Sequence, residues 1–197
     1  MANLRRWGLR AFLLLLIVTF FATWLVVRRN QSRRDFVAAG AVPALTITSS
    51  SFADGSSIPA KFTCDGGDNS PQLSFSAPPS GTKSFLLVAD DPDSPAGSFT
   101  HWVLFNLPPS LRDLPEGASR RADVLQGAVQ GNNDFDKVGY IGPCPPGWSP
   151  HHYRFRVYAL DTMLGFSQGA TKEEVTQAAQ GHVLAEGKWT GLYKRGR

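Results

Sequence analysis

The stretch that decides the fold is SFLLVADDPDSPAGSFTHWVLFNL, residues 84–107. Residues 84–89 form a continuous apolar run, which predicts a strand buried on both faces. Residues 99–107 are apolar and aromatic and predict a second, longer strand. Aspartates, prolines and a glycine stand between the two runs, and these residue types form turns. The stretch therefore predicts two strong strands joined by an acidic loop that its prolines stiffen.

Shorter runs on either side continue the β pattern. Residues 45–48, 72–76 and 152–160 alternate between apolar and polar side chains, as strands with one buried face do. Gly-, Pro-, Asn- and Asp-rich segments separate them and supply turns. Strands therefore dominate, and the predicted fold class is mostly β, with mainly antiparallel strands.

One helix is predicted late in the chain. Thr171 and Glu174 form a T-x-x-E capping box, which marks a helix start. The apolar spacing continues through His182 to Val183, so His182 is expected to be a packed core histidine. Residues 188–193 follow as a short strand or loop. The β domain therefore carries a small C-terminal helical element.

Charge is distributed unevenly along the 197 residues. The chain has a net charge of +4 and a pI near 9.3, but residues 1–35 hold seven of its 20 basic residues and one of its 16 acidic residues. The remainder carries 13 basic and 15 acidic residues. A nucleic-acid-binding domain needs a basic face on its folded part. The charge pattern therefore argues against nucleic acid as a partner.

The basic N-terminal region surrounds residues 11–27, which carry no charge. Such a segment is just long enough for a membrane-spanning helix, and we interpret residues 1–27 as a membrane anchor or uncleaved signal. A cleaved signal peptide is the alternative, with Ala-Gly-Ala at 39–41 as a distant cleavage site. Residues 28–43 are predicted to form a linker and residues 44–197 the domain. The expected protein is single-pass, with its domain facing the periplasm or cell exterior.

Two segments carry unusual chemistry. In the first, Asp90, Asp91 and Asp93 lie within four residues, shortly before His101. Clustered carboxylates repel one another, so they imply turn capping, a cation or a hydrogen-bond network. In the second, a Gly- and Pro-rich loop at 139–147 is followed by a pair of histidines and a tyrosine at 151–153. Taken alone, each segment is equally well explained by a rigid structural loop or by a binding site.

Together these motifs resemble the phosphatidylethanolamine-binding protein family, also called the Raf kinase inhibitor protein family, and most of all its bacterial Raf-kinase-inhibitor-like branch. The resemblance covers residues 45–194. It rests on five motifs: C-D-G-x-x-x-S-P at 64–71, D-P-D-x-P at 91–95 followed by H-W, G-N-x-D-F at 131–135, G-Y-x-G-P-C-P-P at 139–146, and H-x-Y-x-F-x-V-Y-A-L-D at 151–161.

The resemblance implies a β-sandwich of a large and a small sheet, with a small anion-binding cavity near one end. Phosphate and phosphoethanolamine are the expected type of ligand, with amides near Gly142 forming an anion-binding nest. No cofactor and no metal are expected. The matching ligand-binding positions are Asp91, Asp93, His101, Gly142, Pro145, Pro146, His151 and Tyr153.

Two further features follow from the resemblance. Cys64 and Cys144 lie beside motifs that converge in the family fold, so a disulfide is favoured over two buried thiols, in keeping with an oxidising compartment. His152 stands where many members have Arg. Because neighbouring strand residues face opposite ways, His152 is expected to point away from His151.

Three functions follow as hypotheses. The first is non-enzymatic binding of small anions or phospholipid head groups by a membrane-anchored domain. The second is a protein-interaction module that inhibits a kinase or protease through an unidentified partner. The third is weak phosphoesterase activity, for which the sequence offers no recognised nucleophile motif. The sequence leaves a homodimer open.

Overall fold

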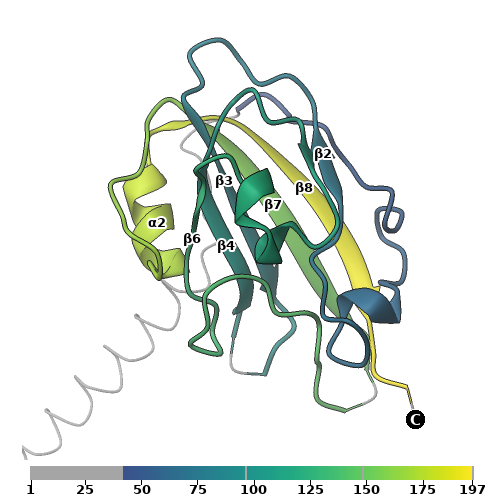
Figure 1. Ribbon diagram of the computed structural model, residues 1–197. Helices are drawn as coiled ribbons and strands as arrows, with labels where there is room; N and C mark the ends of the chain where they lie inside the picture. The colour runs from purple at the N-terminus through teal and green to yellow at the C-terminus, as the bar shows by residue number, and fades with distance from the viewer. Residues whose placement is uncertain (1–41, 96, 148, 197) are drawn as a thin grey trace, which may run out of the picture. The chain divides into compact units, whose positions relative to one another are not determined.

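A computed structural model describes residues 42–95, 97–147 and 149–196. The predicted membrane anchor, the alternative cleavage site and nearly all of the linker lie outside these ranges. Within them, no helix is both long and apolar enough to cross a membrane. The mostly β fold class is confirmed, and the described residues form two antiparallel sheets and one α-helix (Figure 1).

The larger sheet has five strands in the order β6-β4-β3-β7-β8, and every neighbouring pair is antiparallel. The predicted strands of 84–107 are its centre. The strand bounds are β3 Ser84–Asp91, β4 Phe99–Leu107, β6 Val129–Gln130, β7 His151–Leu160 and β8 Val183–Tyr193.

The smaller sheet has three short strands in the order β1-β2-β5. They are β1 Ile47–Thr48, β2 Leu73–Phe75 and β5 Asp113–Leu114. The core lies between the two sheets, where Phe75 packs against Phe85 of β3 at 5.8 Å between ring centroids. Short 3-10 helices lie at Ala60–Phe62, Ala118–Arg120 and Ala122–Val124. The arrangement is a β-sandwich.

Strand β3 is buried along its whole length, as its apolar run predicts. Phe85 and Leu87 face the core between the sheets, while Leu86 and Val88 point to the opposite side. That side is covered in part by α2, Lys172–Ala179, which packs against β4. Figure 1 shows α2 and β2 on opposite sides of the larger sheet. β3 therefore forms the buried centre of the larger sheet.

The helix begins as predicted and ends earlier than predicted. Thr171 accepts from the Glu174 amide, and the Glu174 carboxylate accepts from the Thr171 amide, which completes the capping box. The helix stops at Ala179 because Gly181 turns the chain with a φ of +80° into β8. The prediction for His182 was wrong: its side chain is 47% exposed and lies 2.7 Å from Asp161.

Candidate functional site

The clustered carboxylates at the end of β3 do not share one environment. Asp90 lies on one side of the sheet, 3.0 Å from Arg154 and 2.7 Å from Arg156. Burial acts to raise the pKa of Asp90, but the two guanidiniums and Ser98 lower it below its ordinary value. Asp91 points to the other side. Strand alternation thus separates charges that the sequence places next to each other.

Asp91 is paired with His151, the first residue of β7. Their side chains are 5% and 8% exposed, and Asp91 Oδ2 lies 2.7 Å from His151 Nδ1. The other carboxylate oxygen accepts from the Asp93 backbone amide at 2.8 Å. Asp91 therefore orients the His151 ring: Nδ1 faces the carboxylate, and Nε2 faces away from it.

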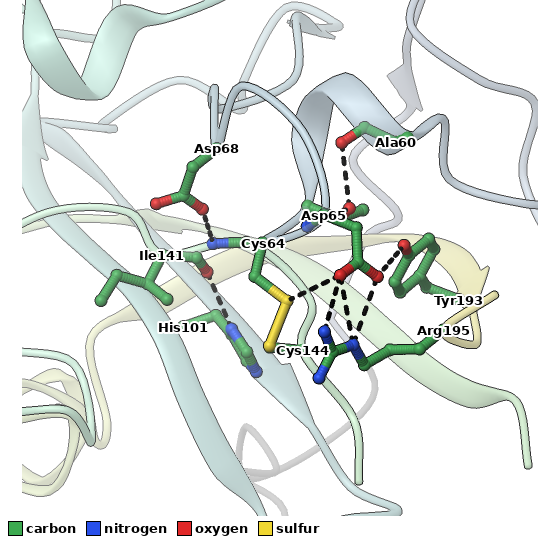
Figure 2. Close-up of a disulfide and its surroundings, with 11 residues drawn as sticks. Ala60, Cys64, Asp65, Asp68, His101, Ile141, Cys144, Tyr193 and Arg195 are labelled. Atoms are coloured by element: carbon green, nitrogen blue, oxygen red, sulfur yellow. Dashed lines mark hydrogen bonds and ion pairs between the residues drawn. A yellow bond between two sulfur atoms is a disulfide. The ribbon is translucent and has the colours of Figure 1, made fainter. Parts of the chain in front are cut away.

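His101 of β4 is held by the glycine- and proline-rich loop. Its Nδ1 lies 2.8 Å from the Ile141 carbonyl oxygen, and the Ile141 amide donates back to the His101 carbonyl at 3.0 Å. Burial lowers the pKa of His101, although Ile141 and nearby carboxylates oppose the shift. Figure 2 shows this contact close to the Cys64–Cys144 disulfide.

Tyr153 of β7 packs its ring edge-on against His101, at 5.2 Å between centroids. Its hydroxyl is buried and makes no hydrogen bond of normal geometry to any described residue. Burial raises the pKa of Tyr153, and the nearby Asp91 carboxylate raises it further. Strands β3, β4 and β7 thus bring together Asp91, His101, His151 and Tyr153, which we call the site cluster.

Asp93 does not direct its carboxylate to the site cluster. Asp93 Oδ2 accepts from the His152 amide at 2.8 Å and lies 2.6 Å from His152 Nδ1. Burial acts to raise the pKa of Asp93, but the hydrogen bonds to His152 and the charge of the two histidines lower it below its ordinary value. The His152 side chain is 56% exposed, so it points away from the buried His151 as predicted. Asp93 therefore joins the loop to β7 through its carboxylate, while its backbone amide donates to Asp91.

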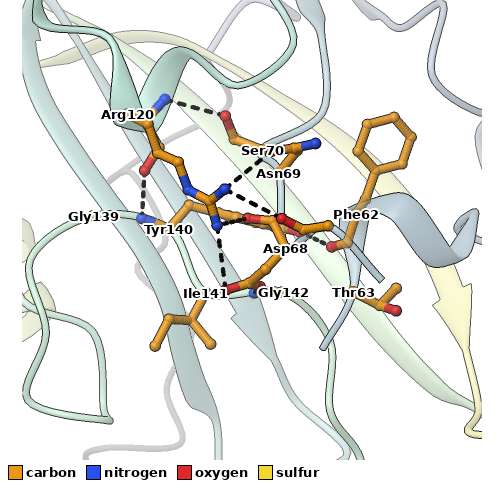
Figure 3. A network of polar contacts seen from close by, with 12 residues as sticks. Phe62, Thr63, Asp68, Asn69, Ser70, Arg120, Gly139, Tyr140, Ile141 and Gly142 are labelled. Atoms are coloured by element: carbon orange, nitrogen blue, oxygen red, sulfur yellow. Dashed lines mark hydrogen bonds and ion pairs between the residues drawn. The ribbon is translucent and has the colours of Figure 1, made fainter. Parts of the chain in front are cut away.

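Gly142 is required by close packing rather than by ligand approach. An added Cβ would lie 2.4 Å from the Phe62 carbonyl oxygen and 2.7 Å from Asp68 Oδ1. The Gly142 amide donates to Asp68 Oδ1 at 2.6 Å, and the Ile141 amide is used by His101. The expectation that amides near Gly142 form an anion-binding nest is therefore wrong for these two groups. Figure 3 shows this contact between the two loops.

The loop's prolines differ in their surroundings. Pro145 is buried and Pro146 is exposed. Pro143 accepts a hydrogen bond at its carbonyl from the Cys64 amide, and the Cys64–Cys144 disulfide joins the same two segments. The predicted pairing is therefore present in the structure. It fastens the loop that holds His101 to residues 60–68.

Several supporting residues were not selected from the sequence. Arg120 donates from its guanidinium to the backbone carbonyls of Asp68 and Gly67, at 2.9 and 3.2 Å (Figure 3). Phe135 is 46% exposed and lies edge-on to Phe99 and His101. Phe135 belongs to the G-N-x-D-F motif, which could have indicated it. Nothing local marks Arg120, because its role depends on a loop some fifty residues away.

No metal site is formed by the residues that the structure describes. Nowhere in 42–95, 97–147 and 149–196 do three or more His, Cys, Asp or Glu side chains gather closely enough to hold an ion. The polar atoms of the site cluster are instead suited to hydrogen bonding. They comprise one carboxylate, two imidazoles and one phenol.

Comparison with known proteins defines the class. Residues 48–194 match the family model described as phosphatidylethanolamine-binding protein. A UPF0098 protein of Methanothermobacter thermautotrophicus is 47% identical over 152 residues, which cover 77% of this chain and 100% of that protein. The chain belongs to the phosphatidylethanolamine-binding protein family.

Two solved structures are similar to the domain. The homologue CT736 of Chlamydia trachomatis matches with a TM-score of 0.71 and 40% identity, over 78% of this chain and 99% of that one. YbcL of Escherichia coli, described as a new member of the mammalian family, matches with a TM-score of 0.73 and 34% identity, over 77% and 99%. Both similarities support the sandwich fold.

Proposed function

We propose that the domain binds small anions of the phosphate class at the site cluster, without turning them over. The observation that carries the proposal is the convergence of Asp91 and two oriented histidines on the buried hydroxyl of Tyr153, which lies near the Asp91 carboxylate but makes no hydrogen bond of normal geometry to a described residue. A buried donor without a partner costs about 1–3 kcal/mol, so its presence is best explained by a ligand that accepts from it. Membership of the family, in which ligand binding is common, supports the same conclusion.

The arrangement favours binding over catalysis. Each histidine of the cluster has its Nδ1 engaged, His151 by Asp91 and His101 by a backbone carbonyl. Neither ring makes a hydrogen bond to a serine or threonine hydroxyl in the described part of the chain. Both cysteines are oxidised and lack a nucleophilic thiolate. The cluster therefore presents oriented partners for an anion but no activated nucleophile.

Calorimetric titration of the full-length protein with inorganic phosphate and phosphoethanolamine tests the proposal. We expect Asp91→Ala and His101→Ala each to weaken binding about tenfold, because each removes an oriented partner. His182→Ala is the matched control, since His182 also pairs with an aspartate but lies outside the cluster. Unchanged affinity in both cluster variants would show that the ligand binds elsewhere. Release of phosphate from phosphoethanolamine would contradict the non-enzymatic assignment.

We also propose that the anchor predicted at residues 1–27 tethers the domain to a membrane, with the domain outside the cytoplasm. The uncharged segment and its flanking arginines support this proposal. Protease added to intact cells should then degrade the domain, whereas a cytoplasmic control protein stays intact. Protection of the domain until the cells are lysed would overturn the proposed orientation.

A further inference from the structure

The protonation pattern of His101 is fixed by its backbone partner. A carbonyl oxygen can only accept, so the contact of 2.8 Å with Ile141 places a proton on Nδ1. In a neutral imidazole the other nitrogen, Nε2, then carries a lone pair and can only accept. No described residue donates a hydrogen bond to Nε2. His101 therefore offers an acceptor to whatever binds beside it.

The surroundings of His101 favour its neutral form. The rings of Phe99, Phe135 and Tyr153 pack against it. The carboxylates of Asp90 and Asp91 on β3 and of Asp134 in the 131–141 segment act to raise its pKa, but burial outweighs them. Because the net shift of the His101 pKa is downward, the neutral form dominates at pH values above about 6.5.

Asp91 adds a second acceptor to the same cluster. Its carboxylate is buried and accepts from His151 and from the Asp93 amide. An oxyanion without any proton would bring its own lone pairs against Asp91 and against Nε2 of His101. Tyr153 and, when protonated at Nε2, His151 supply the donors. The cluster thus has both donors and acceptors, and a ligand that carries one proton satisfies both kinds.

We propose that the site cluster selects phosphate groups that retain a P–OH proton, donated to His101 Nε2 or Asp91, over oxyanions that have none. This inference rests on the proposed function and specifies its ligand class. Inorganic phosphate and protonated phosphomonoesters satisfy it. Sulfates and phosphodiesters, including the diester phosphate of a phospholipid, do not.

Calorimetric titration of the full-length protein with three matched ligands tests this inference. Methyl phosphate has a P–OH only below its second pKa of about 6, whereas methyl sulfate and dimethyl phosphate are singly charged and have none. At about pH 6.5, where His101 is neutral and part of the methyl phosphate keeps its P–OH, we expect methyl phosphate to bind at least about tenfold more tightly than either. At about pH 8, this preference should fall about tenfold or more, because the P–OH is lost. Inorganic phosphate keeps a proton at both pH values and should keep its preference over sulfate.

Methyl sulfate and dimethyl phosphate keep the same charge at both pH values. Any change in their affinity between the two pH values therefore reports ionisation of the protein, and it serves as the correction for methyl phosphate. His101→Gln should bring the preference below about threefold, because an amide can turn its NH₂ group toward the ligand. His182→Gln is the matched control and should leave the preference unchanged. Equal binding of methyl phosphate and methyl sulfate to the unmodified protein would overturn the inference and leave the proposed function intact. No binding of either inorganic phosphate or phosphoethanolamine would overturn the proposed function itself.

Discussion

Tyr153 shows at the residue scale how a binding site can be recognised before its ligand is known. Its ring is ordinary core, packed on His101, but its hydroxyl is buried and makes no hydrogen bond of normal geometry to a residue that the structure describes. Apolar packing explains the ring and leaves the oxygen unexplained. A phenylalanine would fill the same space without that cost. Under the proposed function, this hydroxyl donates to the ligand.

Tyr153→Phe should separate stability from binding. Removing an unpartnered buried hydroxyl leaves the thermal midpoint of the ligand-free protein unchanged or raises it. Phosphate affinity, measured by calorimetry, should fall about fivefold or more because one donor is lost. A lower midpoint with unchanged affinity would indicate that the hydroxyl has a structural partner instead. Tyr193→Phe, which removes a hydrogen bond to Asp65, is the contrasting variant expected to affect stability.

At the scale of elements, three strands supply the side chains of the site cluster and one loop positions His101. β3 supplies Asp91, β4 supplies His101, and β7 supplies His151 and Tyr153. The loop at 139–147 contributes a carbonyl that fixes one ring rather than a set of free amides. Its position depends on Gly142, which fits against the backbone at Phe62. The loop therefore supports the site cluster through His101.

Gly142→Ala tests this dependence. The added methyl group would meet the Phe62 carbonyl oxygen at 2.4 Å, so the loop must shift. We expect a loss of about 1–3 kcal/mol in the free energy of unfolding and weaker phosphate binding. Denaturant unfolding and calorimetry measure the two effects. Gly165→Ala is the matched control because no atom lies within 4 Å of its added Cβ; an equal loss in both variants would argue against a specific role for Gly142.

At the scale of the whole molecule, the disulfide joins segments 80 residues apart in the sequence. It connects the loop at 60–68 with the loop that orients His101, and Asp68 and Arg120 reinforce the same junction. Closing so long a loop reduces the entropy of the unfolded chain. The disulfide therefore stabilises the domain at the junction that supports the site cluster.

Reduction of the Cys64–Cys144 bridge should lower the stability of the domain by about 4 kcal/mol, if loop entropy dominates. The corresponding fall in thermal midpoint is roughly 10 °C for a domain of this size. Calorimetric melting with and without a reductant measures it. A Cys64→Ser, Cys144→Ser double variant should melt at the reduced value under both conditions. Two reactive thiols in the non-reduced protein would show that the bridge is not formed in solution.

Much of the architecture follows from local sequence. The apolar run at 84–89 predicts a strand buried on both faces, and β3 is buried along its whole length. Thr171 and Glu174 locate the start of α2 because capping is a contact between near neighbours. The end of α2 was misjudged, since alanine, histidine and valine at helical spacing do not reveal a turn at Gly181.

The sequence by itself determined the main strands at 84–107 and 152–160 and the helix start, and its resemblance to the family indicated the residues that meet in the site cluster. It did not indicate β5 or β6, nor the full length of β8. Only the tertiary structure decided how their charges are paired and which atoms remain available. Asp90 and Asp91 are adjacent in the chain, but one faces Arg154 and Arg156 while the other faces His151. Local patterns depend on neighbouring residues, whereas protonation and hydrogen bonding depend on partners some forty to sixty residues away.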